Sequence, residues 1–393
     1  MGETVFVLVL NAGSSSLKFN LFDMGKEISI AEGMAERIGL AEGIMTFTFD
    51  SDKHKETLPL PTHREALNAI IERLKAVVLH DTPIHAVGHR VVHGGPKYGD
   101  SLIVTDEVLA DIDHFAMYAP LHNPANALGI RVAREAFPDV PHVAVFDTAF
   151  HHNIPDHART YGIPYELSQK YGIRRYGFHG SSHSYVAART AILLCRPLRA
   201  LKIVTCHIGN GTSICAVHNG KSVDTSMGMT PLQGVIMGTR CGTIDPSVVE
   251  MLMEYEHLDY DGITDLLNKK SGLLGISGVS SDFREIELAA DQGNDRARLA
   301  RDLLTYNVRQ YIGAYATVLD GVDAITFTAG IGTHSTFVRA KVCSKLSFLG
   351  VKLDPEANEF GTGERIISTP DSRVVVTVVP TNEELMIARE TVR

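Results

Sequence analysis

The chain has 393 residues, which is long for a single hydrophobic core and predicts two domains. Hydrophobic residues make up 44% of it and charged residues 21%, as in ordinary soluble globular proteins. Its 46 acidic and 37 basic residues give a net charge of −9, which argues against a general binder of nucleic acids or membrane surfaces. Any anion site must therefore be built from local cations.

Cysteine usage and the apolar runs bear on the compartment. Five cysteines, an odd number without paired spacing, favour reduced thiols and a cytoplasmic location. The N-terminus has no basic region before its short apolar run, and no apolar run approaches the ~18 residues of a membrane span. We therefore expect neither a secretion signal nor a membrane segment.

The first 22 residues predict a β-hairpin with a polar turn. Residues 5–10 are apolar and residues 17–22 alternate, so both stretches indicate strands. The turn at 11–18 carries an amide, a glycine, three hydroxyls and a lysine. Gly13 lets a ligand approach the backbone, and the hydroxyls can donate to phosphate oxygens. A phosphate-holding hairpin is favoured over a Gly/Ser linker, but it is no Walker loop, because that motif and its helix are missing.

Strand and helix signals alternate over the next 125 residues or so. In chain order we expect a strand at 45–49, a helix after Thr62 with capping-box spacing, a strand at 84–92, a helix after Thr105, a helix with Asn123 as N-cap and Pro124 as its first residue, and a strand at 143–146. The last strand delivers Asp147 at its C-terminal end, where functional groups of α/β sheets usually lie.

The second half of the chain repeats this pattern. A strand at 202–206, a polar Gly turn at 207–213 and a strand at 214–217 resemble the opening hairpin, and a further strand at 324–327 leads into a Gly loop at 328–334. We expect helices from Asp245–Pro246 and over 294–319, and a strand at 374–379. The parallel units predict an internal duplication of one mixed-sheet domain, with the domain boundary after Asp147.

The last helix predicts which of two neighbouring acids is available for function. With Thr381 as N-cap, Glu384 occupies the capping-box position and has a structural role. Glu383 is then the carboxylate that is free to face a metal ion.

Charged and titratable groups recur in Gly- or Pro-marked loops, where functional residues concentrate. They are Arg90, His122 with Asp147, His179 and Arg240. Together with Lys18 they would form a pocket for a dense anion, as phosphoryl transfer requires. The alternative for any single arginine is a surface or salt-bridged residue, but that explanation fits the whole set poorly.

Other patterns favour structural explanations. His179 and His183 have the spacing of a zinc pair, but Gly180 replaces the glutamate of the metalloprotease pattern and the cysteines are not in C-x-x-C pairs. Met251 and Met253 are expected to fill core space. In the loop at 275–284, Phe283 and Arg284 could sandwich a flat base, whereas Asp282 or Ser281 could simply cap the following helix.

Nine motifs together resemble the acetate kinases of the acetate and sugar kinase/heat-shock/actin superfamily, from Val5 to about Arg389. They are NAGSSSLKF, GHRVVHGG, APLHNP, VFDTAFH, RRYGFHGSSH, HIGNG, MGTRCG, GVSSDFR and PTNEEL. The resemblance implies an α/β fold of two actin-like (ribonuclease H-like) ATPase domains with mixed sheets around a central cleft. These would comprise residues 1–147 with 381–393, and residues 148–380, the latter carrying the nucleotide site and a homodimer interface.

The resemblance also implies the reaction and its residues. It implies reversible phosphoryl transfer between ATP and acetate, giving ADP and acetyl phosphate, with Mg²⁺, for which Mn²⁺ could substitute. Arg90 and Arg240 would hold acetate and the migrating phosphoryl group, His179 would stabilise the transition state, and Asp147 and His122 would assist. Val92, Leu121, Phe178 and Pro231 would wall the methyl pocket, and Asn11 and Glu383 would lie near the metal. Nucleotide contacts would come from Ser14, Ser16, Lys18, His207, Gly209, Asn210, Gly211, Asp282, Phe283, Arg284, Gly330, Ile331, Gly332, Thr333 and His334.

The chain departs from the family pattern at three places. Gln233 and Thr243 replace carboxylates and could loosen a local network, and Thr333-His334 replaces Glu-Asn on the adenosine side. Our hypothesis is that His334 keeps purine binding by stacking or hydrogen bonding. The competing readings are a propionate kinase of the same family, a sugar kinase and an actin-like regulatory protein. A sugar kinase would want a carboxylate base in place of two arginines.

Overall fold

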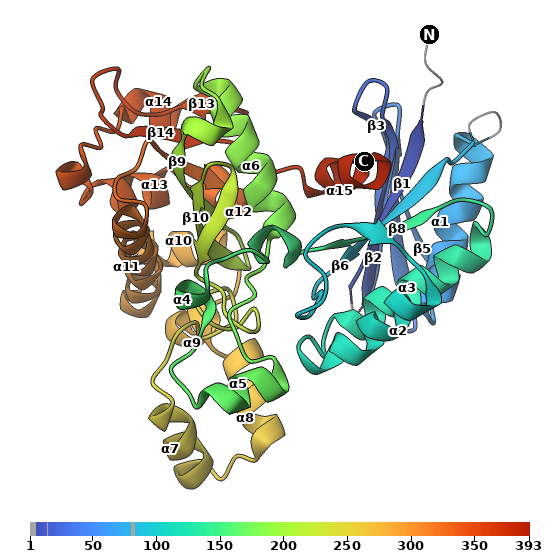
Figure 1. Ribbon diagram of the computed structural model, residues 1–393, viewed down its shortest axis with the longest axis horizontal. Coiled ribbons are helices and arrows are strands. Elements are labelled where there is room, and N and C mark those ends of the chain that lie inside the picture. Colours follow the sequence, from blue (N-terminus) through green and yellow to red (C-terminus); the bar gives the residue numbers. More distant parts are fainter. Residues whose placement is uncertain (1–4, 14, 80–82) are drawn as a thin grey trace. The chain divides into compact units, whose positions relative to one another are not determined.

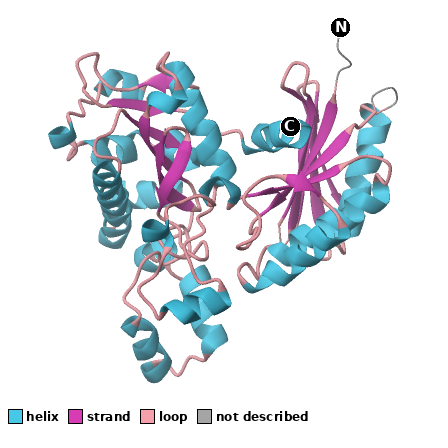
Figure 2. Ribbon diagram, viewed as in Figure 1, coloured by secondary structure: helices cyan, strands magenta, loops and turns pink. Residues whose placement is uncertain are grey.

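The computed structural model describes residues 5–13, 15–79 and 83–393. Contacts divide the chain into two compact units: unit 1 is Met1–His152 with Asn382–Arg393, and unit 2 is Asn153–Thr381. Each unit has a mixed β-sheet with helices packed against it, so the chain has an α/β fold (Figures 1 and 2). None of the described helices combines the length and apolar character that crossing a bilayer requires.

Unit 1 is built on an eight-stranded sheet, within the described residues, of order β5-β4-β3-β2-β1-β6-β8-β7. Its strands are β1 (Phe6–Ala12), β2 (Ser16–Asp23), β3 (Ile28–Glu36), β4 (Gly43–Phe49), β5 (Asp52–Leu58), β6 (Ala86–Val91), β7 (Leu102–Ile103) and β8 (His142–Phe146). Its helices are α1 (His63–Val77), α2 (Asp106–His114), α3 (Asn123–Ala136) and α15 (Glu383–Val392), with 3₁₀ turns at Phe115–Met117 and Ala149–His151.

Helices cover both faces of this sheet. Val87 of β6 belongs to the core that contains residues of α1 and α3. Successive strand residues point to opposite faces, so its neighbour Gly88 points the other way. A Cβ atom at Gly88 would lie 3.0 Å from Ile387 of α15, so the C-terminal helix packs closely on the second face. This packing brings the start of α15 next to β1 and β6, where Asn11 and Arg90 lie.

Unit 2 has a six-stranded sheet, again within the described residues, of order β11-β10-β9-β12-β14-β13. Its strands are β9 (Lys202–Ile208), β10 (Thr212–His218), β11 (Lys221–Thr225), β12 (Ala324–Thr328), β13 (Arg365–Ile366) and β14 (Val375–Val378). Its helices are α4 (Asp156–Arg159), α5 (Tyr165–Tyr171), α6 (Gly180–Leu193), α7 (Ser247–Tyr255), α8 (Tyr260–Lys269), α9 (Gly272–Ser277), α10 (Phe283–Asp291), α11 (Asp295–Val318), α12 (Ala329–His334), α13 (Thr336–Cys343) and α14 (Pro355–Glu359), with 3₁₀ turns at Leu198–Ala200 and Ser347–Leu349.

The two sheets share one topology over six strands. In unit 1 the order β3-β2-β1-β6-β8-β7 has antiparallel, antiparallel, parallel, parallel and antiparallel pairings. In unit 2 the order β11-β10-β9-β12-β14-β13 has the same five pairings in the same succession. The predicted internal duplication is therefore confirmed. The β1–β2 turn of unit 1 and the β9–β10 turn of unit 2 are corresponding elements.

Four local predictions are wrong. Helix α3 begins at Asn123 with His122 as its N-cap residue, because the Asn123 amide is buried and binds the backbone of His93 instead. Helix α15 is capped by Asn382, whose side chain accepts from Leu385 N, and not by Thr381. The Gly loop at 328–334 folds as the short helix α12. Met251 and Met253 are 57% and 41% exposed on α7 and fill no core space.

Candidate active site

Arg90 and Asp147 meet at the carboxyl ends of β6 and β8 in unit 1. These strands are parallel neighbours, so their ends reach the same edge of the sheet. Arg90 donates from Nε to Asp147 Oδ1 at 3.0 Å and from Nη2 to Oδ2 at 2.6 Å. It also donates from Nη1 to Asn11 Oδ1, on the adjacent β1, at 3.3 Å. Three predicted site residues are thus brought together.

The Arg90 guanidinium is held as a cation in a largely buried place. Burial opposes its charge, but Asp147 and Glu383 raise the pKa of Arg90 above its ordinary value. Asp147 is 2% exposed, whereas the Arg90 side chain remains 22% exposed. Asp147 therefore orients a cation that can still reach a ligand.

Glu383 is the first residue of α15, and its carboxyl group and the Arg90 guanidinium influence each other electrostatically. Burial raises its pKa to about 7, with Arg90 acting in the opposite direction. No ion pair of Glu383 occurs among the described residues. Together with the amide oxygen of Asn11 it offers oxygen ligands, which Mg²⁺ prefers, and Mg²⁺ commonly takes one or two carboxylates plus substrate phosphates. The residues present therefore fit a magnesium ion bound with a phosphate substrate.

Glu384 has a different role from the predicted one. Since Asn382 is the N-cap, Glu384 is not at the capping-box position, and it forms an ion pair with Lys18 of β2. This ion pair holds Lys18 next to the start of α15, on the same edge of unit 1. Ser16, the first residue of β2, lies close to Gly13, where a Cβ atom would be 2.9 Å from its hydroxyl. The predicted phosphate contact Ser14 lies outside the described residues.

The residues expected around the acetate methyl group differ in exposure. In unit 1, Val92 is 5% exposed and its N–H donates to Asn126 Oδ1 at 3.0 Å, whereas Leu121 is 49% exposed. His122 follows Leu121 as the N-cap residue of α3, with no side-chain capping bond. In unit 2, Phe178 is 2% exposed.

In unit 2, His179 belongs to a polar cluster with Ser182, His207 and Ser213. It has a left-handed backbone (φ 57°) as the N-cap residue of α6. Its Nδ1 lies 2.8 Å from Ser213 Oγ on β10, and its ring stacks on His207 of β9 with centroids 4.1 Å apart. His207 Nδ1 lies 2.8 Å from Ser182 Oγ of α6. The ring of His179 is therefore held both at its edge and on its face.

The β9–β10 turn places Gly211 directly against this ring. A Cβ atom at Gly211 would lie 3.2 Å from His179 Nε2 and 3.9 Å from Arg240 Nη1. A Cβ atom at Gly238 would overlap the side chain of Asn210, at 1.8 Å from Oδ1, so the loop carrying Arg240 packs on the same turn. The His179 ring, the Arg240 guanidinium and the β9–β10 turn thus surround one small region.

Arg240 makes long polar contacts in this region. Its Nη1 reaches the Pro231 carbonyl oxygen at 3.5 Å and Met237 Sδ at 3.7 Å, and no carboxylate pairs with it among the described residues. Burial lowers the pKa of Arg240. A buried guanidinium without a carboxylate is expected where an anion binds.

The residues that replace family carboxylates make hydrogen bonds of their own. Tyr161 OH donates to Gln233 Oε1 at 2.6 Å, and Gly234 N donates to Thr243 Oγ1 at 3.2 Å. Both replacements therefore have polar partners of their own.

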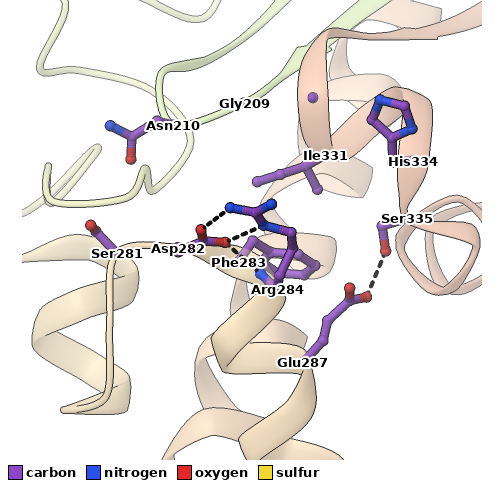
Figure 3. A pocket seen from close by; sticks show the side chains of 11 residues that line it. Gly209, Asn210, Ser281, Asp282, Phe283, Arg284, Glu287, Ile331, His334 and Ser335 are labelled. Carbon is purple, nitrogen blue, oxygen red and sulfur yellow. Dashed lines mark hydrogen bonds and ion pairs between the residues drawn. The ribbon is translucent and has the colours of Figure 1, made fainter. Parts of the chain in front are cut away.

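A cavity of about 700 Å³ opens beside the β9–β10 turn (Figure 3). It is lined by Gly209, Asn210, Ser281, Asp282, Phe283, Arg284, Glu287, Gly330, Ile331, His334 and Ser335. Eight of these eleven residues were predicted nucleotide contacts. The predicted contacts Gly332 and Thr333 are not among the described residues that line the cavity. Its volume is within the range of small-molecule sites.

Of the two roles that the sequence left open for the 281–284 segment, the structure shows helix capping. Asp282 is the N-cap of α10 and accepts from Arg284 N at 2.9 Å. It also pairs with the Arg284 guanidinium, which lowers the pKa of Asp282 to about 2. Phe283 packs into the core of unit 2 and is 4% exposed, so little of its ring is open to the cavity. Arg284 and Ile331 are among the side chains that line the cavity in Figure 3.

Sequence reasoning missed two groups of polar residues. Glu287 lines the cavity and accepts from Ser335 Oγ at 2.6 Å, and Ser335 carried a visible signal as the N-cap of α13. Ser213 lies between His179 and His183, but a strand hydroxyl gives no sequence signal for a contact across 30 residues.

Comparisons with known proteins identify the family of the chain. A model of the acetokinase family matches residues 6–389. The acetate kinase of Dictyoglomus turgidum is 53% identical over 392 residues, covering 98% of this chain and 97% of that protein. The crystal structure of Porphyromonas gingivalis acetate kinase matches with a TM-score of 0.94 and 46% identity over 99% of both chains. A Francisella tularensis propionate kinase structure matches with a TM-score of 0.93 and 40% identity, over 98% of this chain and 99% of that one. The chain belongs to the acetokinase family.

Proposed function

We propose that this chain transfers a phosphoryl group reversibly between ATP and acetate, giving ADP and acetyl phosphate. The carrying observation is the region around Gly211, where His179 Nε2 and the Arg240 guanidinium converge and Arg240 has no described carboxylate partner. Such a region suits the equatorial oxygens of a phosphoryl group in transfer.

The reaction needs charge neutralisation more than acid–base chemistry. Acetate is already ionised near pH 7, so its oxygen can attack phosphorus without a general base while the bond to the departing ADP oxygen breaks. Arg90 would bind the acetate carboxylate, oriented by Asp147, and Arg240 and His179 would bind the phosphoryl oxygens. His122 would add a further contact.

The cavity beside the β9–β10 turn would hold the nucleoside of ATP. Gly209 and Asn210 line it and belong to the same turn as Gly211, so phosphates and base would lie on either side of one turn. His207, and in unit 1 Ser16 and Lys18 with Ser14, would contribute phosphate contacts. Asn11 and Glu383 would hold Mg²⁺, or Mn²⁺ in its place, which supplies charge neutralisation of the phosphates.

Acetate and propionate remain two candidate acids for the same site. Val92, Leu121, Phe178 and Pro231 would enclose the methyl group, but one methylene changes binding in a hydrophobic pocket by only ~1–3 kcal/mol. The similarity to a propionate kinase structure keeps the second candidate open. We favour acetate because relatives that are 50–53% identical over 98% of this chain are named acetate kinases.

We further propose a cytoplasmic homodimer. No disulfide joins the cysteines in the described chain, in keeping with a reducing compartment. Helix α7 of unit 2 has no buried residue, and Val248, Met251, Met253 and Tyr255 are exposed on it. Such an apolar surface supports a self-association interface in the domain of residues 148–380, whereas residues 1–147 with 381–393 would carry Arg90 and the metal ligands.

A hydroxamate-trapping assay tests the function directly. The purified chain is incubated with Mg²⁺ and each pairing of acetate or propionate with ATP, GTP or pyrophosphate, and the acyl phosphate is trapped with hydroxylamine. We expect the highest kcat/KM for acetate with ATP. Failure to form any acyl phosphate would refute the proposal, and a clear preference for propionate would replace the acid.

A further inference from the structure

Ser213 lies between two histidine rings in the interior of unit 2. Its Oγ is 2.8 Å from Nδ1 of His179 and 2.7 Å from Nε2 of His183. The other nitrogen of His183, Nδ1, lies 2.7 Å from Thr205 Oγ1 on β9. Thr205, His183 and Ser213 are all fully buried. They form a continuous row, Thr205–His183–Ser213–His179, from the interior of the sheet to the β9–β10 turn.

Proton counting limits how this row can be arranged. A serine hydroxyl has a single proton, so Ser213 can donate to one histidine and must accept from the other. If His183 donates from Nε2, then Ser213 donates to His179 Nδ1, and Thr205 donates to His183 Nδ1. A neutral His179 then carries its proton on Nε2. All four groups have partners in this arrangement, and successive bonds polarise one another in the same direction.

The Nε2 end of His179 is the one that faces the region around Gly211. A Cβ atom at Gly211 would be 3.2 Å from this nitrogen. A proton on Nε2 would be donated to an anionic oxygen there, whereas the other neutral tautomer would present a lone pair and repel it. The state of Ser213 therefore decides whether a neutral His179 attracts or repels a phosphoryl oxygen.

We propose that Ser213 and His183, supported by Thr205, are positioning residues that hold the His179 ring with a proton on Nε2 toward the transferred phosphoryl group. This inference rests on the proposed function of His179. The row acts only through His179, because its members are buried. It is a neutral counterpart of the carboxylate that orients a histidine in other enzymes.

The test compares variants that remove one hydroxyl each. Ser213→Ala is expected to lower kcat about 10-fold, the worth of one orienting hydrogen bond, with KM for acetate and ATP changed less than about 2-fold. Thr205→Val should lower kcat by a smaller factor, and Thr205→Ser, which keeps the hydroxyl, should restore it. The matched control is Thr326→Val: Thr326 pairs in register with Thr205 on the adjacent β12, but its hydroxyl bonds Thr190 and Thr377. The control should keep the parent kcat.

A spectroscopic measurement separates this inference from the proposed function. In protein labelled with [¹⁵N]histidine, with the His179 signals identified by their loss in His179→Asn, the parent should show the Nε2–H tautomer and Ser213→Ala both tautomers. An unchanged tautomer or an unchanged kcat in Ser213→Ala would overturn the inference. A wild-type chain that forms no acyl phosphate, or a His179→Asn variant with full turnover, would instead overturn the proposed function. Should Ser213→Ala fail to fold, unchanged kcat in Thr205→Val would overturn the inference alone.

Discussion

Arg90 and Asp147 form a two-point ion pair, with Nε to Oδ1 at 3.0 Å and Nη2 to Oδ2 at 2.6 Å, at the ends of adjacent parallel strands. Arg240 is the contrasting case, because it is also largely buried but has no carboxylate partner among the described residues. Arg90 is thus fixed by a carboxylate of the protein, and we propose that Arg240 pairs with an anionic substrate. This contrast gives the two cations different expected effects on stability, although both should matter for turnover.

Replacing either arginine should reduce turnover strongly. We expect Arg90→Ala and Arg240→Ala each to lower kcat by roughly 10²–10⁴, the size of comparable losses of electrostatic stabilisation. Arg189→Ala is the control, since Arg189 pairs with Glu364 on unit 2 away from the β9–β10 turn. Hydroxamate formation at saturating acetate and ATP measures the effect. Near-normal turnover in both variants would contradict the site assignment.

The same two positions should respond oppositely when stability is measured. Arg90→Ala leaves the 2% exposed Asp147 carboxylate without its cation, which should cost about 3 kcal/mol of unfolding free energy. Arg240→Met removes a partly buried charge that has no carboxylate partner in the described part of the chain, and it keeps most of the side-chain volume. Unfolding free energy should therefore stay equal or rise by about 1 kcal/mol. Urea unfolding without ligands measures both. A loss of similar size in the two variants would show that Arg240 is already compensated in the protein.

A single methyl group at Gly211 should damage the site without unfolding the chain. In Gly211→Ala the added Cβ would lie 3.2 Å from His179 Nε2 and 3.9 Å from Arg240 Nη1. We expect a fall in kcat of at least about 10-fold, because the added methyl group displaces the phosphoryl group or the ring. The control is Gly313→Ala on α11, where a Cβ atom would have no neighbour within 4 Å. Equal kcat in the two variants would argue against transfer beside Gly211.

The repeated topology was accessible from sequence, because a strand–polar turn–strand unit appears in both halves of the chain. Local helix ends were less predictable. Thr381 and Asn382 are both good N-cap residues, and the choice of Asn382 depends on how α15 packs on unit 1. Met251 and Met253 were expected in the core because methionine commonly fills core space, and the three-dimensional structure shows that they are exposed on α7.

For the site, sequence indicated the residue types but not their partners. Asp147 was expected to assist in the active site, but the sequence did not indicate its direct partner Arg90, an interaction set by the pairing of β6 with β8. The hydroxyls of Thr205 and Ser213 escaped notice, since strand Thr and Ser residues are common and carry no motif. Spacing predicts which side chains share an element, but contacts between elements require the register of the sheet.

The cavity on unit 2 should select purine nucleotides in part through His334. His334 lines the cavity from the end of α12, where the family pattern expects a different residue. We expect His334→Ala to raise KM for ATP about 5-fold with little change in kcat, because base stacking contributes about 1 kcal/mol away from the reacting atoms. His334→Phe should restore binding if the ring stacks, and His334→Asn if it donates a hydrogen bond. Exclusive use of pyrophosphate by the wild-type chain would overturn the purine hypothesis.

The buried His89–His142 pair should make unit 1 sensitive to acid. His142 Nε2 must donate to the Phe137 carbonyl oxygen at 3.0 Å, so His89 Nε2 donates to His142 Nδ1 at 2.9 Å, and both rings are neutral. Burial lowers the pKa of His89 well below its ordinary value and also lowers that of His142. The unfolded chain therefore binds more protons below about pH 6.5, and its histidines drive unfolding as pH falls.

The unfolding free energy should thus fall below about pH 6.5, by up to about 1.4 kcal/mol per pH unit for each histidine, and this contribution should be constant above that pH. In His89→Gln the amide can still donate to His142 Nδ1 but cannot titrate, so the slope between pH 5 and 6.5 should lose about one proton. His54→Gln is the control, because His54 lies at an exposed position of β5. This variant keeps both buried histidines, so the contribution of the pair to the pH slope should be unchanged. Urea unfolding at half-unit pH intervals measures the slopes. An identical slope for His89→Gln and the wild-type chain would mean that His89 is protonated in the folded protein, against the hydrogen-bond pattern of the pair.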